Sequence, residues 1–139
     1  MRNRRNLYRK RKHSYRKSKN VFFSFKYAIN GLIYCAKSER NFKIQLLSAF
    51  LILLISSLFE FSNIEYIILF STIFLVLILE LINTSIESLV DLLIDKKFNK
   101  LARISKDTAA TAVFLASLNS IIVALYLFLP KIKLLFTDL

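Results

Sequence analysis

A row of acidic and amide side chains lies inside one of the most apolar stretches of the chain. Residues 66–86 carry a single charge, that of Glu80. Asn83, Thr84, Glu87 and Asp91 follow Glu80 at offsets of 3, 4, 7 and 11 residues, which places all five on one stripe of a helix. Because an ionisable group at membrane depth is costly, this stripe indicates a function and needs a partner, such as a cation or a phosphate with its metal.

Three further ionisable residues are expected at the same membrane level: Glu39, Lys106 and Asp107. Carboxylate oxygens suit Mg²⁺, so Glu39 is a candidate second metal ligand beside the stripe. A lysine can neutralise a phosphate as a point charge, and a carboxylate below the membrane surface can act as general base for a lipid hydroxyl. These are the parts of a site for phosphoryl transfer.

Spacing alone leaves two other interpretations of the stripe open. The stripe also fits a polar network that only holds an oligomer together, and it fits an ion or proton pathway. With Gly31 as the single glycine, neither of the glycine-rich phosphate loops of common kinases is possible. One cysteine and one histidine exclude an intrachain disulfide and make a structural zinc site unlikely to form.

The hydrophobic residues, 55% of 139, are gathered into long runs that predict an all-α integral membrane protein. Helical spacing of apolar residues predicts an amphipathic surface helix over 21–37. Three transmembrane helices are expected at about 42–61, 64–87 and 108–129, with a polar connection before the third and Pro130 at its end. Together they make a membrane domain over 21–139.

Residues 1–20 hold ten of the 21 Lys and Arg residues and no acid, so we expect a disordered cytoplasmic tail. Such a tail suits anionic lipid headgroups, and specific nucleic-acid recognition is not expected. The positive-inside rule places the N-terminus and the connection before the third span in the cytoplasm. The stripe and its partners then lie at the cytoplasmic face of a multi-pass protein.

Two segments carry a resemblance to a known family. They read ELINTSIESLVD, from Glu80 to Asp91, and ARISKDTAATAV, from Ala102 to Val113. They closely resemble the signature of the prokaryotic diacylglycerol kinase family, which includes the undecaprenol kinases of Gram-positive bacteria. The segments SFKYAINGL (24–32) and SERNF (38–42) look like the Gram-positive branch. Gln45 stands where some members carry an acid.

The resemblance implies a homotrimeric lipid kinase of the bacterial plasma membrane that uses ATP and Mg²⁺. By the family's motif, Glu80 matches the general base, and Glu39 and Glu87 match the metal ligands. The positions around the nucleotide are matched by Asn83, Asp91, Lys106 and Asp107. The implied substrate is a membrane lipid alcohol, undecaprenol in preference to diacylglycerol; a small ion-conducting or structural oligomer is the alternative of another class.

Overall fold

The described part of the chain, residues 21–95 and 97–137 of a computed structural model, is helical and contains no strand. The helices are α2 (Val21–Ser38), α3 (Arg40–Ser56), α4 (Asn63–Ile94) and α5 (Lys100–Thr137). The chain divides into two compact units, 1–33 and 34–139, and the packing described below is that of the second unit. The predicted all-α class is confirmed, whereas the predicted tail over 1–20 lies outside the described residues.

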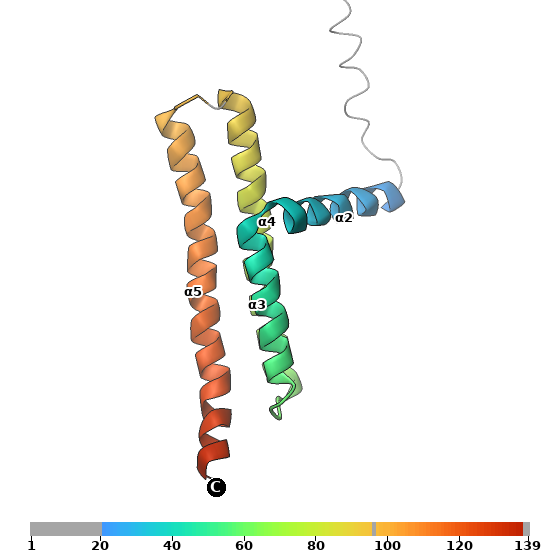
Figure 1. The fold of residues 1–139 in the computed structure, drawn as a ribbon, viewed down its shortest axis with the longest axis vertical. Helices are drawn as coiled ribbons and strands as arrows, with labels where there is room; N and C mark the ends of the chain where they lie inside the picture. The colour runs from blue at the N-terminus through green and yellow to red at the C-terminus, as the bar shows by residue number, and fades with distance from the viewer. Residues whose placement is uncertain (1–20, 96, 138–139) are drawn as a thin grey trace, which may run out of the picture. The chain divides into compact units, whose positions relative to one another are not determined.

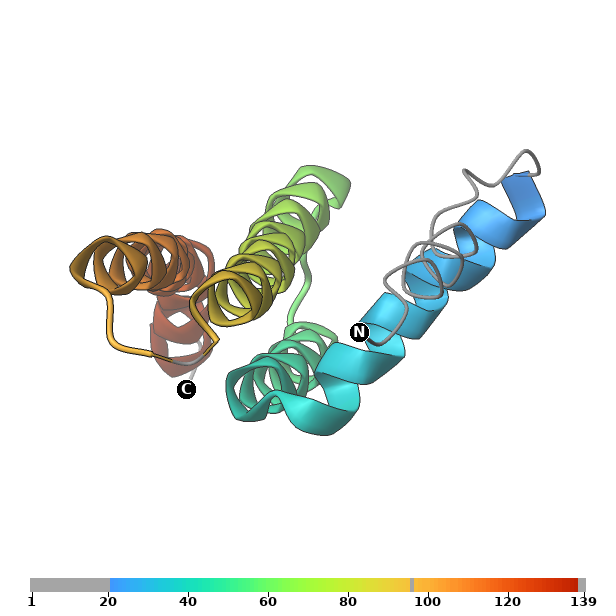
Figure 2. The same cartoon turned by 90° about the horizontal axis from the view of Figure 1, so that it is seen from above.

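Two of the described helices, α4 and α5, are long and apolar enough to cross a membrane. They run side by side in opposite directions and are joined by the short segment 95–99 (Figures 1 and 2). Both helices continue beyond the predicted spans, so the polar connection is much shorter than the sequence suggested. The acidic stripe and Lys106 therefore lie on regular helices, where their directions are fixed by the helical repeat.

The ends of α4 are set by local chemistry. At its start Ser62 and Glu65 form a capping box: the Ser62 hydroxyl accepts from the Glu65 amide at 3.3 Å, and the Ser62 amide donates to Glu65 Oε2 at 2.7 Å. At its end Asp95 adopts a left-handed conformation, with φ of 50°. Asn99 then caps α5, because its Oδ1 accepts from the amides of Leu101 and Ala102.

Helix α3 packs on α4 and is shorter than the predicted span of about 42–61. It has 17 residues and ends at Ser56, and a turn leads into α4. The Ser57 and Leu58 amides bond back to α3 carbonyl groups in this turn. Among the described helices α3 is thus shorter than α4 and α5, the two that are long and apolar enough to cross a membrane.

The prediction that Pro130 ends the last helix is wrong. Helix α5 continues through Pro130 to Thr137. Proline removes one backbone donor and leaves the carbonyl group four residues earlier without its helical partner, but apolar helices at membrane depth tolerate this defect. The extra turns bring Lys131 to the loop that precedes α4.

The seam between α4 and α5 is built from residues three or four positions apart. Its α4 side includes Leu69, Thr72, Val76, Glu80 and Asn83, all buried; the α5 side includes Ala109, Val113, Ala116 and Leu127, also buried. The small residues lie toward the start of α5, so the helices can approach closely there. The stripe inferred from sequence is thus part of a packed helix interface.

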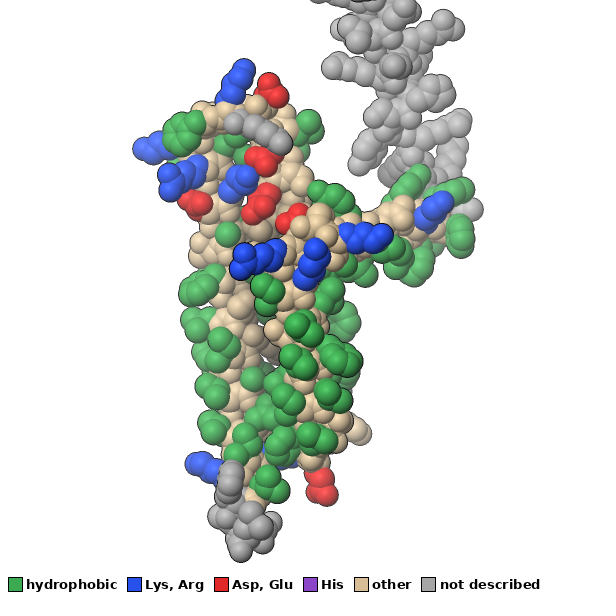
Figure 3. All heavy atoms as spheres, viewed as in Figure 1, with side chains coloured by type: hydrophobic (Ala, Val, Ile, Leu, Met, Phe, Trp, Pro, Cys, Tyr) green, Lys and Arg blue, Asp and Glu red, His purple; other side chains and the backbone are tan. Residues whose placement is uncertain are grey.

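The chemistry of the second unit changes along its length. Lys, Arg, Asp and Glu side chains gather at the end where segment 95–99 joins α4 to α5, and hydrophobic side chains cover the long middle (Figure 3). At the opposite end Leu69, Leu127 and Phe128 form a buried cluster, with Phe59 packed edge-on against Phe128 at 5.7 Å between ring centroids. This division matches a helix pair whose middle lies in lipid.

Lys131 connects α5 to the start of α4. Its ammonium group donates to the Glu60 carbonyl oxygen at 2.5 Å and to Glu65 Oε2 at 3.1 Å, and lies 5.3 Å from the Phe61 ring centroid. The Lys131 and Glu65 side chains are only 21% and 25% exposed. Three contacts from one partly buried cation fix this end of the helix pair.

Replacing Lys131 with Met is expected to lower the midpoint of thermal unfolding in detergent by a few degrees, because the Glu60 carbonyl group and Glu65 lose their donor. The exposed Lys97→Met variant is the charge-matched control. Equal melting curves for Lys131→Met and Lys97→Met would show that the connection does not contribute to stability.

Candidate functional site

Glu80 is the most deeply buried carboxylate among the described residues, with 3% of the residue exposed. It projects from the middle of α4 toward α3 and the start of α5. Gln45 on α3 donates from Nε2 to Glu80 Oε2 at 3.0 Å. Among the described residues no Lys or Arg side chain forms an ion pair with Glu80, so its hydrogen-bond partner is a neutral amide.

Asn83 and Glu87 form the next part of the stripe. The Asn83 amide donates from Nδ2 to Glu87 Oε1 at 3.0 Å, one helical turn further along α4. Asn83 is 7% exposed, and its Oδ1 atom is buried without a hydrogen-bond partner among the described residues. The bond orients the Glu87 carboxylate, while the buried Oδ1 remains an acceptor for a bound group.

Asp91 and Lys106 join the two long helices near the 95–99 segment. Lys106 Nζ lies 2.9 Å from Asp91 Oδ1, and the two side chains are 33% and 41% exposed. Asp107 instead pairs with Arg103 on its own helix at 3.6 Å, in an exposed position. The structure therefore brings Lys106 to the acidic stripe and directs Asp107 to an exposed pair.

Glu39 lies at the junction of α2 and α3, next to Cys35 at the end of α2. Burial raises the pKa of the Cys35 thiol; a hydrogen bond with Thr84 partly offsets this, and the nearby Glu39 and Glu80 carboxylates add to the increase. The electrostatic effect of both carboxylates on one thiol places Glu39 and Glu80 in the same neighbourhood.

A cavity of about 350 Å³ opens beside Glu80. Its polar lining comes from Gln45, Glu80, Asn83, Asn41 and Ser117, and Ala110, Val113 and Phe114 of α5 form the apolar wall. It therefore combines one carboxylate with amide groups at the depth where α4 becomes apolar. Such a cavity suits a ligand that has a polar head and an apolar continuation.

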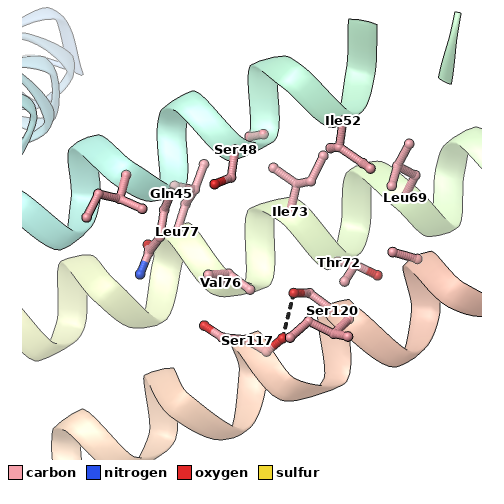
Figure 4. Close-up of a pocket in the computed structure, with 14 residues that line it drawn as sticks. Gln45, Ser48, Ile52, Leu69, Thr72, Ile73, Val76, Leu77, Ser117 and Ser120 are labelled. Atoms are coloured by element: carbon pink, nitrogen blue, oxygen red, sulfur yellow. Dashed lines mark hydrogen bonds between the residues drawn. The ribbon is translucent and has the colours of Figure 1, made fainter. Parts of the chain in front are cut away.

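A second, largely apolar cavity of about 410 Å³ shares Ile44, Gln45 and Ser117 with the first. Side chains of α3, α4 and α5 converge on it, with Gln45 toward one end and Leu69 toward the other (Figure 4). The Ser120 hydroxyl donates to the Ser117 carbonyl oxygen at 2.7 Å, and the Thr72 hydroxyl to that of Ile68 at 2.8 Å. These hydroxyl groups are bonded within their own helices.

Residues that could hold a metal are few in the described ranges. No group of three or more His, Cys, Asp and Glu side chains lies close enough together there to bind an ion unaided. Mg²⁺, however, commonly takes one or two protein carboxylates and completes its shell with phosphate oxygens and water. Glu87, oriented by Asn83, and the half-buried Glu39 fit that kind of donor set.

Sequence reasoning did not assign a role to Gln45 or to the contact between Cys35 and Thr84. The signal for Gln45 was a single amide in an apolar stretch of α3, but nothing in the spacing shows that α3 presents it to Glu80. Cys35 and Thr84 lie 49 positions apart in the sequence, so no local pattern indicates that the two side chains interact.

Comparison with known proteins shows to which family this chain belongs. The model of the family described as prokaryotic diacylglycerol kinase matches residues 26–128. The chain belongs to the prokaryotic diacylglycerol kinase family. An undecaprenol kinase of Bacillus subtilis is 42% identical over 119 residues, 85% of this chain and 96% of that protein. A diacylglycerol kinase of Synechocystis is 38% identical over 122 residues, 88% of this chain and 70% of that protein.

A third relative, a diacylglycerol kinase of Haemophilus influenzae, is 31% identical over 93 residues, 67% of this chain and 78% of that protein. The protein is accordingly a lipid kinase, a transferase that takes a phosphoryl group from a nucleotide. Family membership gives the activity of the protein as a whole, and the part that the stripe plays in it is proposed below. The family is associated with membranes, in agreement with the two candidate spans.

Lys106→Met is expected to raise KM for the nucleotide about tenfold or more, the cost of one lost charge-assisted hydrogen bond to a phosphate. The half-exposed pair with Asp91 contributes little to stability, so the melting temperature should hardly change. Lys100→Met removes a positive charge from the same end of α5 and serves as control. Equal KM values for Lys106→Met and Lys100→Met would exclude a contact between Lys106 and the nucleotide.

Proposed function

We propose that the protein is an ATP- and Mg²⁺-dependent kinase that phosphorylates the hydroxyl group of a membrane lipid alcohol. The proposed substrate is undecaprenol. The observation that carries the proposal is the burial of Glu80 on a helix long and apolar enough to cross a membrane. This carboxylate lines a cavity whose other polar groups are amides and a serine hydroxyl. A base at that depth is suited to an alcohol that arrives from the lipid phase.

In this proposal Glu80 is the catalytic base. Its carboxylate accepts the proton of the lipid hydroxyl as the hydroxyl oxygen attacks the terminal phosphorus of ATP. A new oxygen–phosphorus bond forms, the bond to the bridging oxygen of ADP breaks, and ADP leaves. Because the nucleophile is an unactivated alcohol, a positioned base accelerates the step by about 10² to 10⁴-fold.

The remaining residues of the site would bind the nucleotide and its metal, whereas Glu80 would contact the lipid hydroxyl. Glu39 and Glu87 would hold Mg²⁺, which supplies charge neutralisation for the phosphates when bound. Lys106 and Asp107 at the start of α5, with Asn83 and Asp91 on α4, would complete the nucleotide site. The buried Asn83 Oδ1 atom and the ion pair between Asp91 and Lys106 support this assignment.

The choice of undecaprenol rests on two kinds of similarity. The segments 24–32 and 38–42 resemble the Gram-positive branch, and the Bacillus subtilis undecaprenol kinase matches this chain over nearly its whole length. The alternative is a diacylglycerol kinase that makes phosphatidic acid, favoured by the name of the Synechocystis relative. Each substrate offers one hydroxyl group on an apolar body.

The proposal includes a membrane arrangement in a bacterial plasma membrane. The domain over 21–139 would form a homotrimer of subunits with three spans each, α3 being the short first span, and α2 would lie in the cytoplasmic interface. Lys97, Lys100 and Arg103 around the 95–99 segment support a cytoplasmic position for that end. The basic tail would contact anionic lipid headgroups.

The substrate is tested by phosphate transfer from labelled ATP in mixed micelles that contain undecaprenol or diacylglycerol at equal mole fraction. We expect kcat/KM for undecaprenol to exceed that for diacylglycerol by about tenfold or more, the discrimination that apolar contacts provide. Omission of Mg²⁺ should abolish transfer to either lipid. Faster transfer to diacylglycerol would show that diacylglycerol is the preferred substrate. The assignment of the protein as a lipid kinase would still hold.

A further inference from the structure

Gln45 has a contact that no part of the proposed nucleotide or metal site explains. It stands on α3 between Ile44 and Leu46, in a stretch that is otherwise apolar, and its Nε2 donates to Glu80 Oε2 at 3.0 Å. Within the described residues no other hydrogen bond to the Glu80 carboxylate is found. The direction of the base is therefore set from α3, a different helix from its own.

The type of donor matters for a base. An amide is neutral, so it fixes one carboxylate oxygen without the strong attraction that Lys or Arg would exert. A cation at this position would hold the negative charge too tightly for efficient proton transfer. Glu80 Oε1 has no hydrogen-bond partner among the described residues, so it is left to accept the hydroxyl proton.

The orientation of the Gln45 amide follows from the acceptor character of Glu80 Oε2. With Nε2 toward the carboxylate, Gln45 Oε1 is buried and has no hydrogen-bond partner in the described part of the chain. The reverse orientation would place two acceptors against each other. The amide thus leaves its own acceptor unsatisfied, at a cost in stability, in order to donate to Glu80.

The other polar side chains that line the cavity make no hydrogen bond to Glu80 among the described residues: the Asn83 amide donates to Glu87, and the rest are Asn41 and Ser117. Across the cavity, α5 contributes Ala110, Val113, Phe114 and Ser117, and only the serine has a side chain that can donate. Removal of the Gln45 amide would leave the carboxylate to rotate about its side-chain bonds.

We propose that Gln45 is a positioning residue for the reaction: its side-chain amide holds one oxygen of the Glu80 carboxylate and directs the second oxygen to the lipid hydroxyl. This inference rests on the proposed role of Glu80 as base. It assigns to α3 a part in catalysis beyond spanning the membrane, because the register of α3 on α4 decides whether the amide reaches the carboxylate.

The test compares Gln45→Met, a side chain of equal length without a donor, with the wild-type protein in the mixed-micelle assay. We expect kcat to fall about 10- to 100-fold, the effect of losing one hydrogen bond to a charged group. KM for ATP should stay within about twofold, since the nucleotide residues are unchanged. The exposed Leu47→Met variant on the same helix is the control and should retain full kcat.

A coupling measurement separates positioning from a structural effect. Glu80→Asp shortens the carboxylate beyond the reach of the amide, so adding Gln45→Met to Glu80→Asp should cause little further loss of kcat, about threefold at most. If the two losses multiply, Gln45 acts independently of Glu80 and the inference is overturned.

The remaining outcomes are also decisive. Wild-type kcat in folded Gln45→Met, with transfer by the wild-type protein intact, would overturn the positioning role and leave the proposed kinase standing. A rise in KM for ATP at unchanged kcat would assign Gln45 to nucleotide binding and overturn the inference as well. Circular dichroism and melting curves of each variant show that the comparison is made on folded protein.

Discussion

The position of one buried carboxylate constrains the rest of this structure. Glu80 lies among apolar residues of α4, where an unpaired charge is expensive and water is scarce. The chain lowers that cost with a neutral donor from α3 and a cavity beside the carboxylate, in place of a countercharge. A positively charged partner would reduce the basicity that the proposed chemistry requires. The site is thus a compromise between stability and reactivity.

The helices around Glu80 are arranged to maintain this compromise. Small residues at the start of α5 allow close approach to α4, and the Lys131 contacts with the Glu60–Glu65 region fix the opposite end of the pair. The ion pair between Asp91 and Lys106 joins the same two helices near the 95–99 segment. The contacts at the two ends of the pair thus join the same two helices that bring Glu80 and Asn83 to the cavity.

The helical face that bears the acidic stripe was predictable from the sequence, because the spacing of its residues follows the helical repeat. The spacing of Glu80, Asn83, Glu87 and Asp91 predicted one helical face, and the structure buries or half-buries all four. The end of the last helix was harder to predict. Helix α5 continues through Pro130, because a long apolar helix tolerates the backbone hydrogen bond that a proline removes. The Gln45–Glu80 bond was not foreseen, because the register between two apolar helices depends on packing that no short motif encodes. The roles of individual site residues remain proposals.

The central claim is that Glu80 activates the lipid hydroxyl, and one paired measurement tests it most directly. Transfer of phosphate from labelled ATP to lipid and equilibrium binding of ATP would be measured on the same preparations of wild-type and Glu80→Gln protein. The account predicts that Glu80→Gln loses about 10² to 10⁴-fold in transfer rate and binds ATP within about twofold of wild type. Transfer at the wild-type rate by Glu80→Gln would contradict the account, because the buried carboxylate would then have no part in the chemistry.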